Sequence, residues 1–196
     1  NKKITVYAVV FNPETEEINA VKGYVESNGY ISIEAEKFQK SVESERAKWL
    51  KIPLIGRTLS GITITPGTVA VKAPGAESPH LEYHIYLFSP GKIKVKAYLS
   101  PTLNFPNEQG LRYAVSIDDE TPQIINMHTK TDLEAWKKQV ADNVNIQIST
   151  HTITKPGRHT LKFWLVDPAV VLQKIVILSG KEKESYLGPP ESRFIK

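Results

Sequence analysis

The chain has 196 residues, of which 40% are hydrophobic and 23% charged, and its 25 basic and 21 acidic residues give a net charge of +4. A chain of this size can bury a core without disulfides or metals, and its lack of cysteine excludes a disulfide scaffold and a thiol nucleophile. Basic and acidic residues are mixed rather than gathered in a stripe, so nucleic-acid binding is not predicted. No apolar run reaches the about 18 residues of a membrane span.

Residues 1–79 contain an entry segment, a helical segment and a loop-rich region. The chain begins at Asn1 without an initiator methionine, so we expect a processed protein or a piece of a longer one, with residues 1–20 as an entry strand or linker. A short helix is predicted over residues 44–50. Residues 51–79 are rich in Gly, Pro, Ser and Thr, and this composition predicts long loops.

Beyond residue 80, apolar and polar residues alternate in successive segments. A period of two predicts strands that turn one face to a core. The segment 171–178 is apolar nearly throughout, which predicts a more central strand. The alternating segments are 81–88, 93–99, 111–117, 146–148 and 161–165.

Turn-forming residues join these segments. Ser89-Pro90-Gly91 and Pro156-Gly157 each join two segments at hairpin distance, and residues 118–122 join another pair. About nine or ten strands spaced in this way predict an all-β fold, a two-sheet antiparallel β-sandwich of jelly-roll type. We expect residues 1–196 to form a single domain, with residues 180–196 as an extended C-terminal tail.

One helix interrupts the strands. Thr131 and Glu134 have the spacing of a capping box, with Thr131 as the N-cap. Leu133, Trp136, Val140 and Val144 follow at helical spacing. This stripe predicts that Trp136 packs against the sandwich, so that Trp136→Ala would lower the stability by about 3–5 kcal/mol.

The remaining tryptophan of the strands is less constrained. Trp164 alternates with Phe163 and Leu165 and therefore lies on the opposite face of its strand. It lies either under the helix or on an exposed interaction surface.

The sequence contains no recognisable catalytic site. His80 and His84 are about 13 Å apart on a strand, too far to share a metal. We interpret His151 and His159, which flank a turn, as surface residues. The acidic cluster 118–120 falls in a predicted turn rather than in a paired-carboxylate site, and there is neither a phosphate-binding loop nor a nucleophile elbow. We therefore expect the domain itself to have no enzymatic activity.

Several longer motifs together resemble the C-terminal domain of glycoside hydrolase family 115, the xylan α-1,2-glucuronidases. The resemblance covers residues 12–192, and these motifs carry it: 29–36 (GYISIEAE), 49–53 (WLKIP), 56–58 (GRT), 60–61 (SG), 98–105 (YLSPTLNF), 110–116 (GLRYAVS), 156–162 (PGRHTLK), 166–168 (VDP), 171–177 (VLQKIVI) and 186–192 (YLGPPES).

This resemblance implies a non-catalytic accessory domain of an exported, periplasmic or extracellular enzyme acting on glucuronoxylan. The family's catalytic residues lie in a separate domain, so none is carried over. The resemblance favours a domain that docks on the catalytic domain, shapes its cleft or mediates homodimerisation. The alternative is a carbohydrate-binding module for xylan or its methylglucuronic acid branches.

The motif around residues 33–36 is also similar to the start of carbohydrate-binding modules of the family 6 and 35 type. Those modules use glutamates there to hold a structural calcium, which implies Glu34 and Glu36 as candidate ligands. An aspartate of the last strand completes the site in those modules, whereas this chain has Gln173 in the matching position. The neutral amide weakens the expectation of calcium.

Five residues are candidates for contact with a sugar. An aromatic ring can stack on a sugar, and arginine binds a uronate carboxylate in fork geometry. Trp49 and Arg57 offer this pair in the loop-rich region, and Arg57 is the first choice for an acidic sugar. Tyr98, Asn104 and Arg112 flank another long loop. The structural alternative is that Trp49 anchors a loop and Arg57 pairs with a carboxylate.

Overall fold

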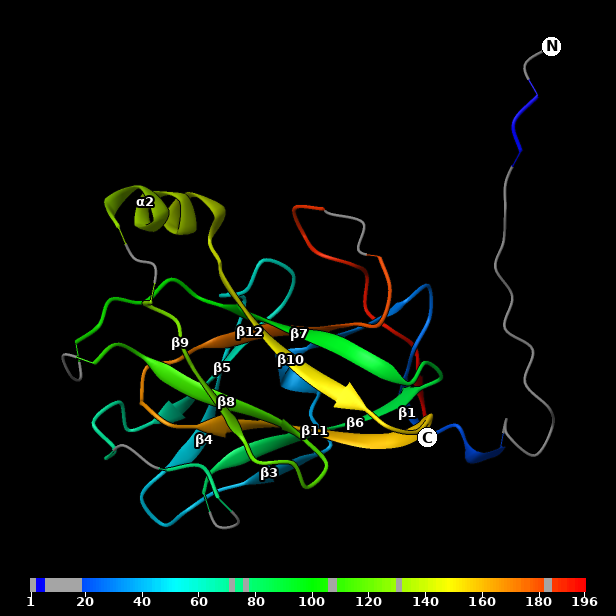
Figure 1. Ribbon diagram of the computed structural model, residues 1–196. Coiled ribbons are helices and arrows are strands. Elements are labelled where there is room, and N and C mark those ends of the chain that lie inside the picture. Colours follow the sequence, from blue (N-terminus) through cyan, green and yellow to red (C-terminus); the bar gives the residue numbers. More distant parts are fainter. Residues whose placement is uncertain are drawn as a thin grey trace.

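In the computed structural model (Figure 1), two β-sheets pack face to face, and an α-helix over residues 133–142 projects from them. The structure describes residues 3–5, 19–70, 73–75, 78–105, 109–129, 132–181 and 185–196. The predicted entry segment 1–20 lies largely outside these residues. No helix within them is long and apolar enough to serve as a membrane span.

The first sheet has seven strands in the order β13-β1-β6-β11-β8-β9, with β3 also paired to β6. The pairing of β1 with β6 is parallel, and the other pairings described in this sheet are antiparallel. Its strands are β1 (Gly23–Val25), β3 (Lys40–Val42), β6 (His80–Leu87), β8 (Arg112–Ile117), β9 (Gln123–Asn126), β11 (Gly157–Leu165) and β13 (Phe194–Ile195).

The second sheet has six antiparallel strands in the order β10-β7-β12-β5-β4, with β2 also paired to β12. Every residue of β12 is buried, as the apolar composition of this segment predicts. Its strands are β2 (Tyr30–Glu34), β4 (Lys48–Ile52), β5 (Gly61–Thr65), β7 (Gly91–Leu99), β10 (Asn145–Ile153) and β12 (Leu172–Leu178). The predicted β-sandwich is thus confirmed.

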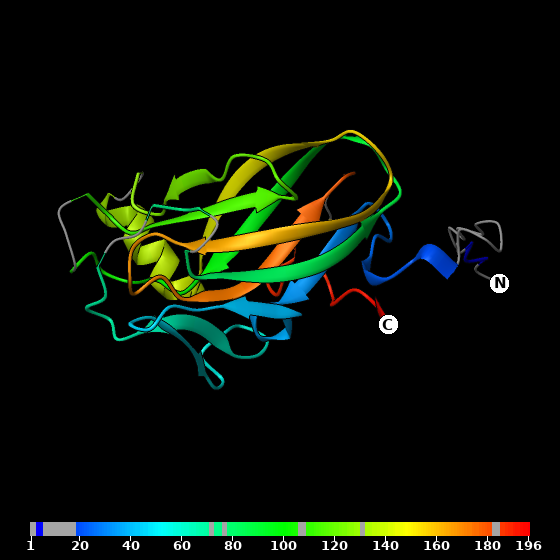
Figure 2. The same cartoon turned by 90° about the horizontal axis from the view of Figure 1, so that it is seen from below.

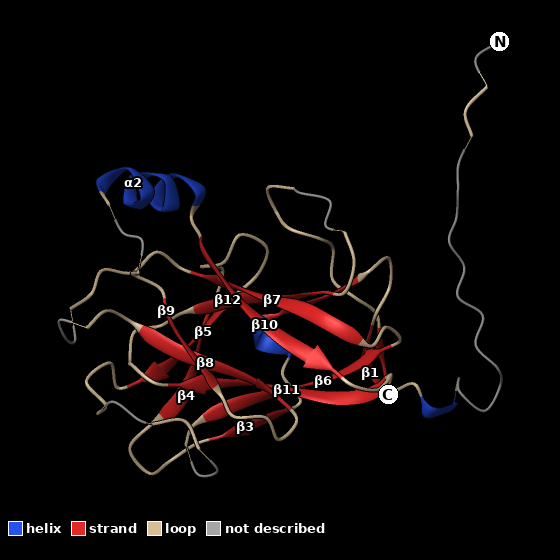
Figure 3. Cartoon of the chain, viewed as in Figure 1, coloured by secondary structure: helices blue, strands red, loops and turns tan. Residues whose placement is uncertain are grey.

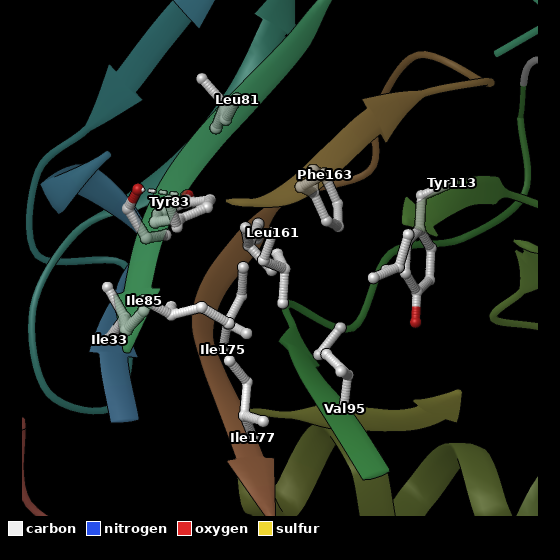
Figure 4. Close-up of a cluster of buried hydrophobic side chains, with 14 of the residues drawn as sticks. Ile33, Leu81, Tyr83, Ile85, Val95, Tyr113, Leu161, Phe163, Ile175 and Ile177 are labelled. Carbon is white, nitrogen blue, oxygen red and sulfur yellow. Dashed lines mark hydrogen bonds between the residues drawn. The ribbon is translucent and has the colours of Figure 1, made fainter. Parts of the chain in front are cut away.

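The main core lies between the two sheets (Figure 4). Val95 and Ile175 of the second sheet and Leu161 of the first are at most 1% exposed. Tyr83, also fully buried, donates its hydroxyl hydrogen to the carbonyl of Ala35 in the 3₁₀-helix η1 (Ala35–Lys37), at 2.7 Å, so its polar atom is satisfied within the core. This apolar layer makes the sandwich a rigid support for its loops.

Two of the predicted hairpins are wrong. The turns at Ser89-Pro90-Gly91 and Pro156-Gly157 connect β6 to β7 and β10 to β11, and in both cases the two strands belong to opposite sheets (Figure 2). The turn over residues 118–122 does join paired strands, β8 and β9. Turn chemistry reverses the chain direction, but it does not specify whether the next strand hydrogen-bonds to the last or crosses to the other sheet.

The N-terminal predictions also need correction. The predicted helix over 44–50 is instead a tight turn closed by a bridge between Ser44 and Ala47, followed by β4. The predicted loop region 51–79 contains β5, whose central residues Ile62 and Ile64 are buried. Burial of this short alternating segment outweighed the turn-rich composition around it.

The helix α2 (Leu133–Asp142) begins after Asp132, whose side chain accepts a hydrogen bond from the backbone N–H of Ala135 at 2.7 Å. Asp132 is thus the N-cap, and Thr131 lies outside the described residues. All of α2 is described, and none of its side chains is buried. Figure 3 shows α2 standing beside the sandwich rather than against its core.

The C-terminal tail crosses the outer face of the second sheet. The Ser32 hydroxyl of β2 donates to the carbonyl of Pro189 at 3.0 Å, and the backbone N–H of Ser192 donates to the carbonyl of Ser32 at 2.9 Å. The tail then ends in β13, which pairs with β1 of the first sheet. It therefore covers β2, β12 and Tyr98 of β7 on this face, whereas Ile146 and Ile148 of β10 stay exposed.

Candidate functional site

Two hollows flank α2. The first, which we call the Trp136 pocket, has a volume of about 520 Å³ and lies between the N-terminal half of α2 and the loops that precede β8 and follow β9. The second, which we call the α2 groove, has a volume of about 910 Å³ and lies between α2, the tail and the outer face of β7 and β10. The sequence candidates Arg57 and Tyr98 line the groove, and Asn104 lines the pocket.

Arg57 holds one end of the α2 groove together. Its Nε donates to the carbonyl of Asp142 at the end of α2 at 2.6 Å, and a terminal nitrogen donates to the carbonyl of Tyr186 in the tail. Its guanidinium carbon lies 4.0 Å from the centre of the Tyr186 ring. Arg57 therefore braces helix and tail, as the structural alternative predicts, although through carbonyls rather than a carboxylate.

The two aromatic candidates lie apart. Trp49 on β4 is half-buried against the core, and its indole N–H donates to the carbonyl of Val42 at 3.0 Å. Tyr98 on β7 is 4% exposed, and its ring lies beneath Gly188 of the tail. The structure does not bring Trp49 to Arg57 as a stacking platform, and Tyr98 presents little of its ring.

Arg112 makes a structural ion pair. Its Nε and a terminal nitrogen donate to the two oxygens of Asp167 at 2.7 and 3.1 Å, and its backbone N–H donates to Asp167 at 2.8 Å. Asp167 is fully buried, and hydrogen bonding to it raises the pKa of Arg112. The guanidinium fork is occupied by this carboxylate, and Arg112 links the start of β8 to the segment after β11.

The Trp136 pocket corrects the packing predicted for this tryptophan. The indole is partly exposed and lines the pocket together with Leu133, whose side chain is 66% exposed. Of the apolar stripe, Leu133 and Trp136 line the pocket and Val144 lines the groove, whereas Val140 is 52% exposed. Asn104 lies on the opposite wall.

Two pocket residues were missed by the sequence reasoning. Asn126 donates its amide to the carbonyl of Gln109 at 2.7 Å and accepts from the backbone N–H of His128 at 2.9 Å. The ring of His128 bonds to the carbonyl of Thr102 at 2.8 Å and to the N–H of Leu111 at 3.3 Å. The signal that could have found them is the cluster of amide and histidine residues just after a strand, where binding residues commonly lie.

The candidate calcium ligands face lysines. Glu34 is 6% exposed, lies 3.0 Å from the ammonium of Lys174, and accepts a hydrogen bond from Thr58. Glu36 lies in η1 rather than on the same strand, and is 2.8 Å from Lys51. Hydrogen bonds from Lys51 and then from Ser60 lower the pKa of Glu36.

These contacts do not fit a shared calcium ion. The ammonium of Lys174 already neutralises the buried Glu34 carboxylate, and it would repel a divalent cation placed beside that carboxylate. The amide of Gln173 donates to the Ser100 hydroxyl and to the carbonyl of Asn143, and its oxygen accepts from the N–H of Arg57. Calcium binding stays a prediction from the sequence.

Two acidic residues of the turn over residues 118–122 pair with histidines of β10 and β11. His151 and Glu120 are hydrogen-bonded, and His159 lies 2.6 Å from Asp118. His151 is 2% exposed, so its prediction as a surface residue is wrong. Within the described part of the chain, no three His, Asp or Glu side chains gather as a metal site.

The indole of Trp164 is used in packing. It is 5% exposed, stacks on His80 at 4.2 Å between ring centres, and donates its N–H to Ser116 at 2.8 Å. The sequence left open whether Trp164 lies under the helix or on an exposed surface, and its burial excludes the exposed surface.

Comparison with known proteins places these features in a family. Among solved structures, a family 115 4-O-methyl-α-glucuronidase with specificity for decorated arabinogalactans aligns with a TM-score of 0.55 at 22% identity. The alignment covers 74% of this chain and 18% of that one. A family 35 carbohydrate-binding module from Clostridium thermocellum gives a TM-score of 0.49 at 14% identity, over 75% of this chain and 97% of the module.

An exo-β-1,3-galactanase from Phanerochaete chrysosporium gives a TM-score of 0.48 at 12% identity, over 78% of this chain and 30% of the enzyme. No curated protein matches the chain. The family profile described as "Glycosyl hydrolase family 115 C-terminal domain" matches residues 23–191, which is most of the described sandwich. The chain therefore belongs to the family of C-terminal domains of glycosyl hydrolase family 115.

Proposed function

We propose that this domain is a non-catalytic accessory domain that docks through the α2 groove on the remainder of a family 115 glycoside hydrolase. The observation that carries the proposal is the exposure of α2 and of the sheet beside it: the helix is amphipathic and buries none of its side chains within the domain, and the exposed Ile146 and Ile148 line the groove next to it. An amphipathic helix is stabilised mainly by packing of its apolar face, so an unburied one is suited to a partner.

The exposed apolar part of the groove lies on the sheet and the tail. Ile146 and Ile148 on β10, which line the groove, are 38% and 50% exposed. Tyr186 of the tail, 60% exposed, lines the same groove. Exposed apolar side chains that line one hollow beside polar residues are typical of an interaction site.

The charges around the groove indicate the chemistry of the partner surface. Lys96 on β7 and Lys138 on α2 line the groove, and Lys92 and Lys94 continue the outer face of β7. The hydrogen bond from Lys138 lowers the pKa of Asp142 at the end of the helix. We infer a partner surface with an apolar centre and an acidic border, which would make docking weaken at high salt.

The parent enzyme follows from the family rather than from the geometry of this domain. The sequence motifs favour an exported α-1,2-glucuronidase that acts on glucuronoxylan in the periplasm or outside the cell. Its reaction would belong to the catalytic domain of that enzyme; in this domain Asp118 and Glu120 of the turn after β8 are hydrogen-bonded to histidines. Homodimerisation through the same groove is the alternative, and the experiment must distinguish it from docking on the catalytic domain.

The test compares full-length enzyme carrying this domain with an Ile146→Asp/Ile148→Asp variant and an Ile124→Asp control. Ile124 lies on β9 of the other sheet and is 55% exposed, so its substitution introduces an exposed aspartate, one charge instead of two, away from the groove. We expect hydrogen exchange of the α2 amides to be slow in the wild type and the control but fast in the double variant. Equal exchange rates in all three proteins would refute docking.

Sedimentation of the same proteins separates the two partners. If the groove binds the catalytic part of the same chain, the double variant keeps the mass of the wild type. If the groove binds a second copy of the chain, the double variant should sediment with half the mass of the wild type.

A further inference from the structure

We propose that the Trp136 pocket binds an uncharged pyranose unit of a polysaccharide, separately from docking through the α2 groove. The two hollows use different flanks of α2: Asp132, Leu133 and Trp136 line the pocket, whereas Lys138 and Asp142 line the groove. The proposal therefore does not depend on the proposed docking function.

The apolar wall of the pocket suits the C–H face of a sugar ring. Trp136 is partly exposed on a helix that fully buries none of its side chains, and part of its surface lines the pocket. Leu133 extends the same wall. A tryptophan beside a hollow offers a broad, rigid surface with a polar N–H at its edge, and this combination matches an amphipathic ring of C–H and hydroxyl groups.

The opposite wall offers planar hydrogen-bonding groups. Asn104 and Asn126 line the pocket, and a carboxamide both donates and accepts, as a pair of neighbouring hydroxyls does. The Asn126 amide is held by its bonds to Gln109 and His128, so its orientation is set before a ligand arrives. Such preorganisation lowers the entropy cost of binding.

Two further contacts fix the wall that the loop before β8 and the turn after β9 form together. The His128 ring bridges Thr102 and Leu111, and therefore ties the loop before β8 to the turn after β9. Gly110 has a φ of +94°, and a Cβ there would lie 2.4 Å from Oδ1 of Asn126. The backbone thus approaches the amide more closely than any other residue would allow.

The charges on the described residues of the pocket disfavour an acidic sugar. Among the residues described around it, Asp132 is the one carboxylate, and neither lysine nor arginine lines the pocket. One Asp132 oxygen caps α2 at Ala135, which keeps the carboxylate at this position. A uronate would bring a second carboxylate beside Asp132 without a cation to bind it, whereas the hydroxyls of a neutral sugar can donate to the aspartate.

The experiment titrates the wild-type chain with neutral xylo-oligosaccharide and galacto-oligosaccharide, and separately with glucuronic acid, using tryptophan fluorescence and calorimetry. We expect saturable binding of at least one neutral oligosaccharide and none of glucuronic acid. Trp136→Ala should weaken binding about tenfold or more, as removal of a central aromatic contact does. Trp136→Phe should retain most of the affinity and lose the fluorescence change.

Phe194→Ala is the matched control, because it removes an aromatic that is 38% exposed from β13 of the first sheet, away from the pocket and from α2. We expect it to bind as the wild type does. Absence of saturable binding at millimolar ligand, equal affinity in wild type and Trp136→Ala, or tighter binding of glucuronic acid than of the neutral sugars would each overturn the proposal. None of these results bears on the hydrogen-exchange test of docking.

Discussion

Substitution of Arg112 by methionine should be among the most destabilising single changes on the sandwich. The variant keeps the length of the side chain but removes two side-chain hydrogen bonds to Asp167 and the positive charge that neutralises it. Asp167 has no exposed surface, so its charge cannot be solvated in the folded state. Removing one partner of a buried pair costs about 3–5 kcal/mol.

The structure places the expected value at the lower end of that range. The Arg112 side chain is 25% exposed, so water can enter the space that it leaves, and the carboxylate keeps its bond from the backbone N–H of Arg112. We therefore expect a loss of about 3 kcal/mol. Urea unfolding followed by tryptophan fluorescence measures it, and the denaturant slope should stay the same if both states keep their compactness.

Two variants make this prediction sharp. Arg112→Met/Asp167→Asn should recover part of the loss, because the neutral amide is less costly to bury than an unpaired carboxylate. Lys40→Met removes an exposed ammonium, 59% accessible, from its pair with Glu82 and should change the stability by less than about 1 kcal/mol. A loss below about 1 kcal/mol in Arg112→Met would show that the pair is not structural and would return Arg112 to the candidate ligand residues.

Three further results are expected from the packing and the charges. Trp136→Ala should lower the stability by less than about 1 kcal/mol, whereas Ile175→Ala in the core should cost about 2–5 kcal/mol; equal losses in thermal unfolding would contradict the exposed position of α2. Folding lowers the pKa of Glu36 below its ordinary value of 4.5, so the ionised carboxylate stabilises the folded state at pH values above 4.5. The difference in stability between wild type and Glu36→Gln should therefore vanish as the pH falls through the pKa of Glu36 in the folded state. If Lys174 supplies the cation for Glu34, addition of calcium or of a chelator should leave the wild-type melting temperature unchanged, and a rise with calcium would restore the calcium site.

The alternation of apolar residues predicted the strands well because burial on one face leaves a period of two wherever a strand covers a core. It could not predict the partners of those strands. The segments 81–88 and 93–99 look like a hairpin in the sequence, yet β6 and β7 lie in opposite sheets. Burial alone is satisfied in either arrangement, and the choice depends on strands far away in the sequence, such as β11 and β12.

The candidate site was predictable only in its residue types. Arg57 finds its partners at Asp142 and Tyr186, 85 and 129 positions further along the chain, and both contacts use backbone carbonyls that leave no trace in the sequence. Trp136 has the spacing of a packed residue, because the apolar residues of a helix recur with the same period whether the helix faces a hollow or a core. Sequence spacing reports which side of a helix is apolar and not what covers it.

The pairing of β1 with β13 also decides how the domain responds to force. Gly23, at the start of β1, stands opposite Ile195, at the end of β13, so the chain enters and leaves the sandwich at neighbouring points. Antiparallel bonds run perpendicular to the strands, and a pull that separates these two points loads them one after another rather than together. Tension would therefore peel the short β13 away first and transfer the load next to the tail on Ser32, long before it reached the central strand β12.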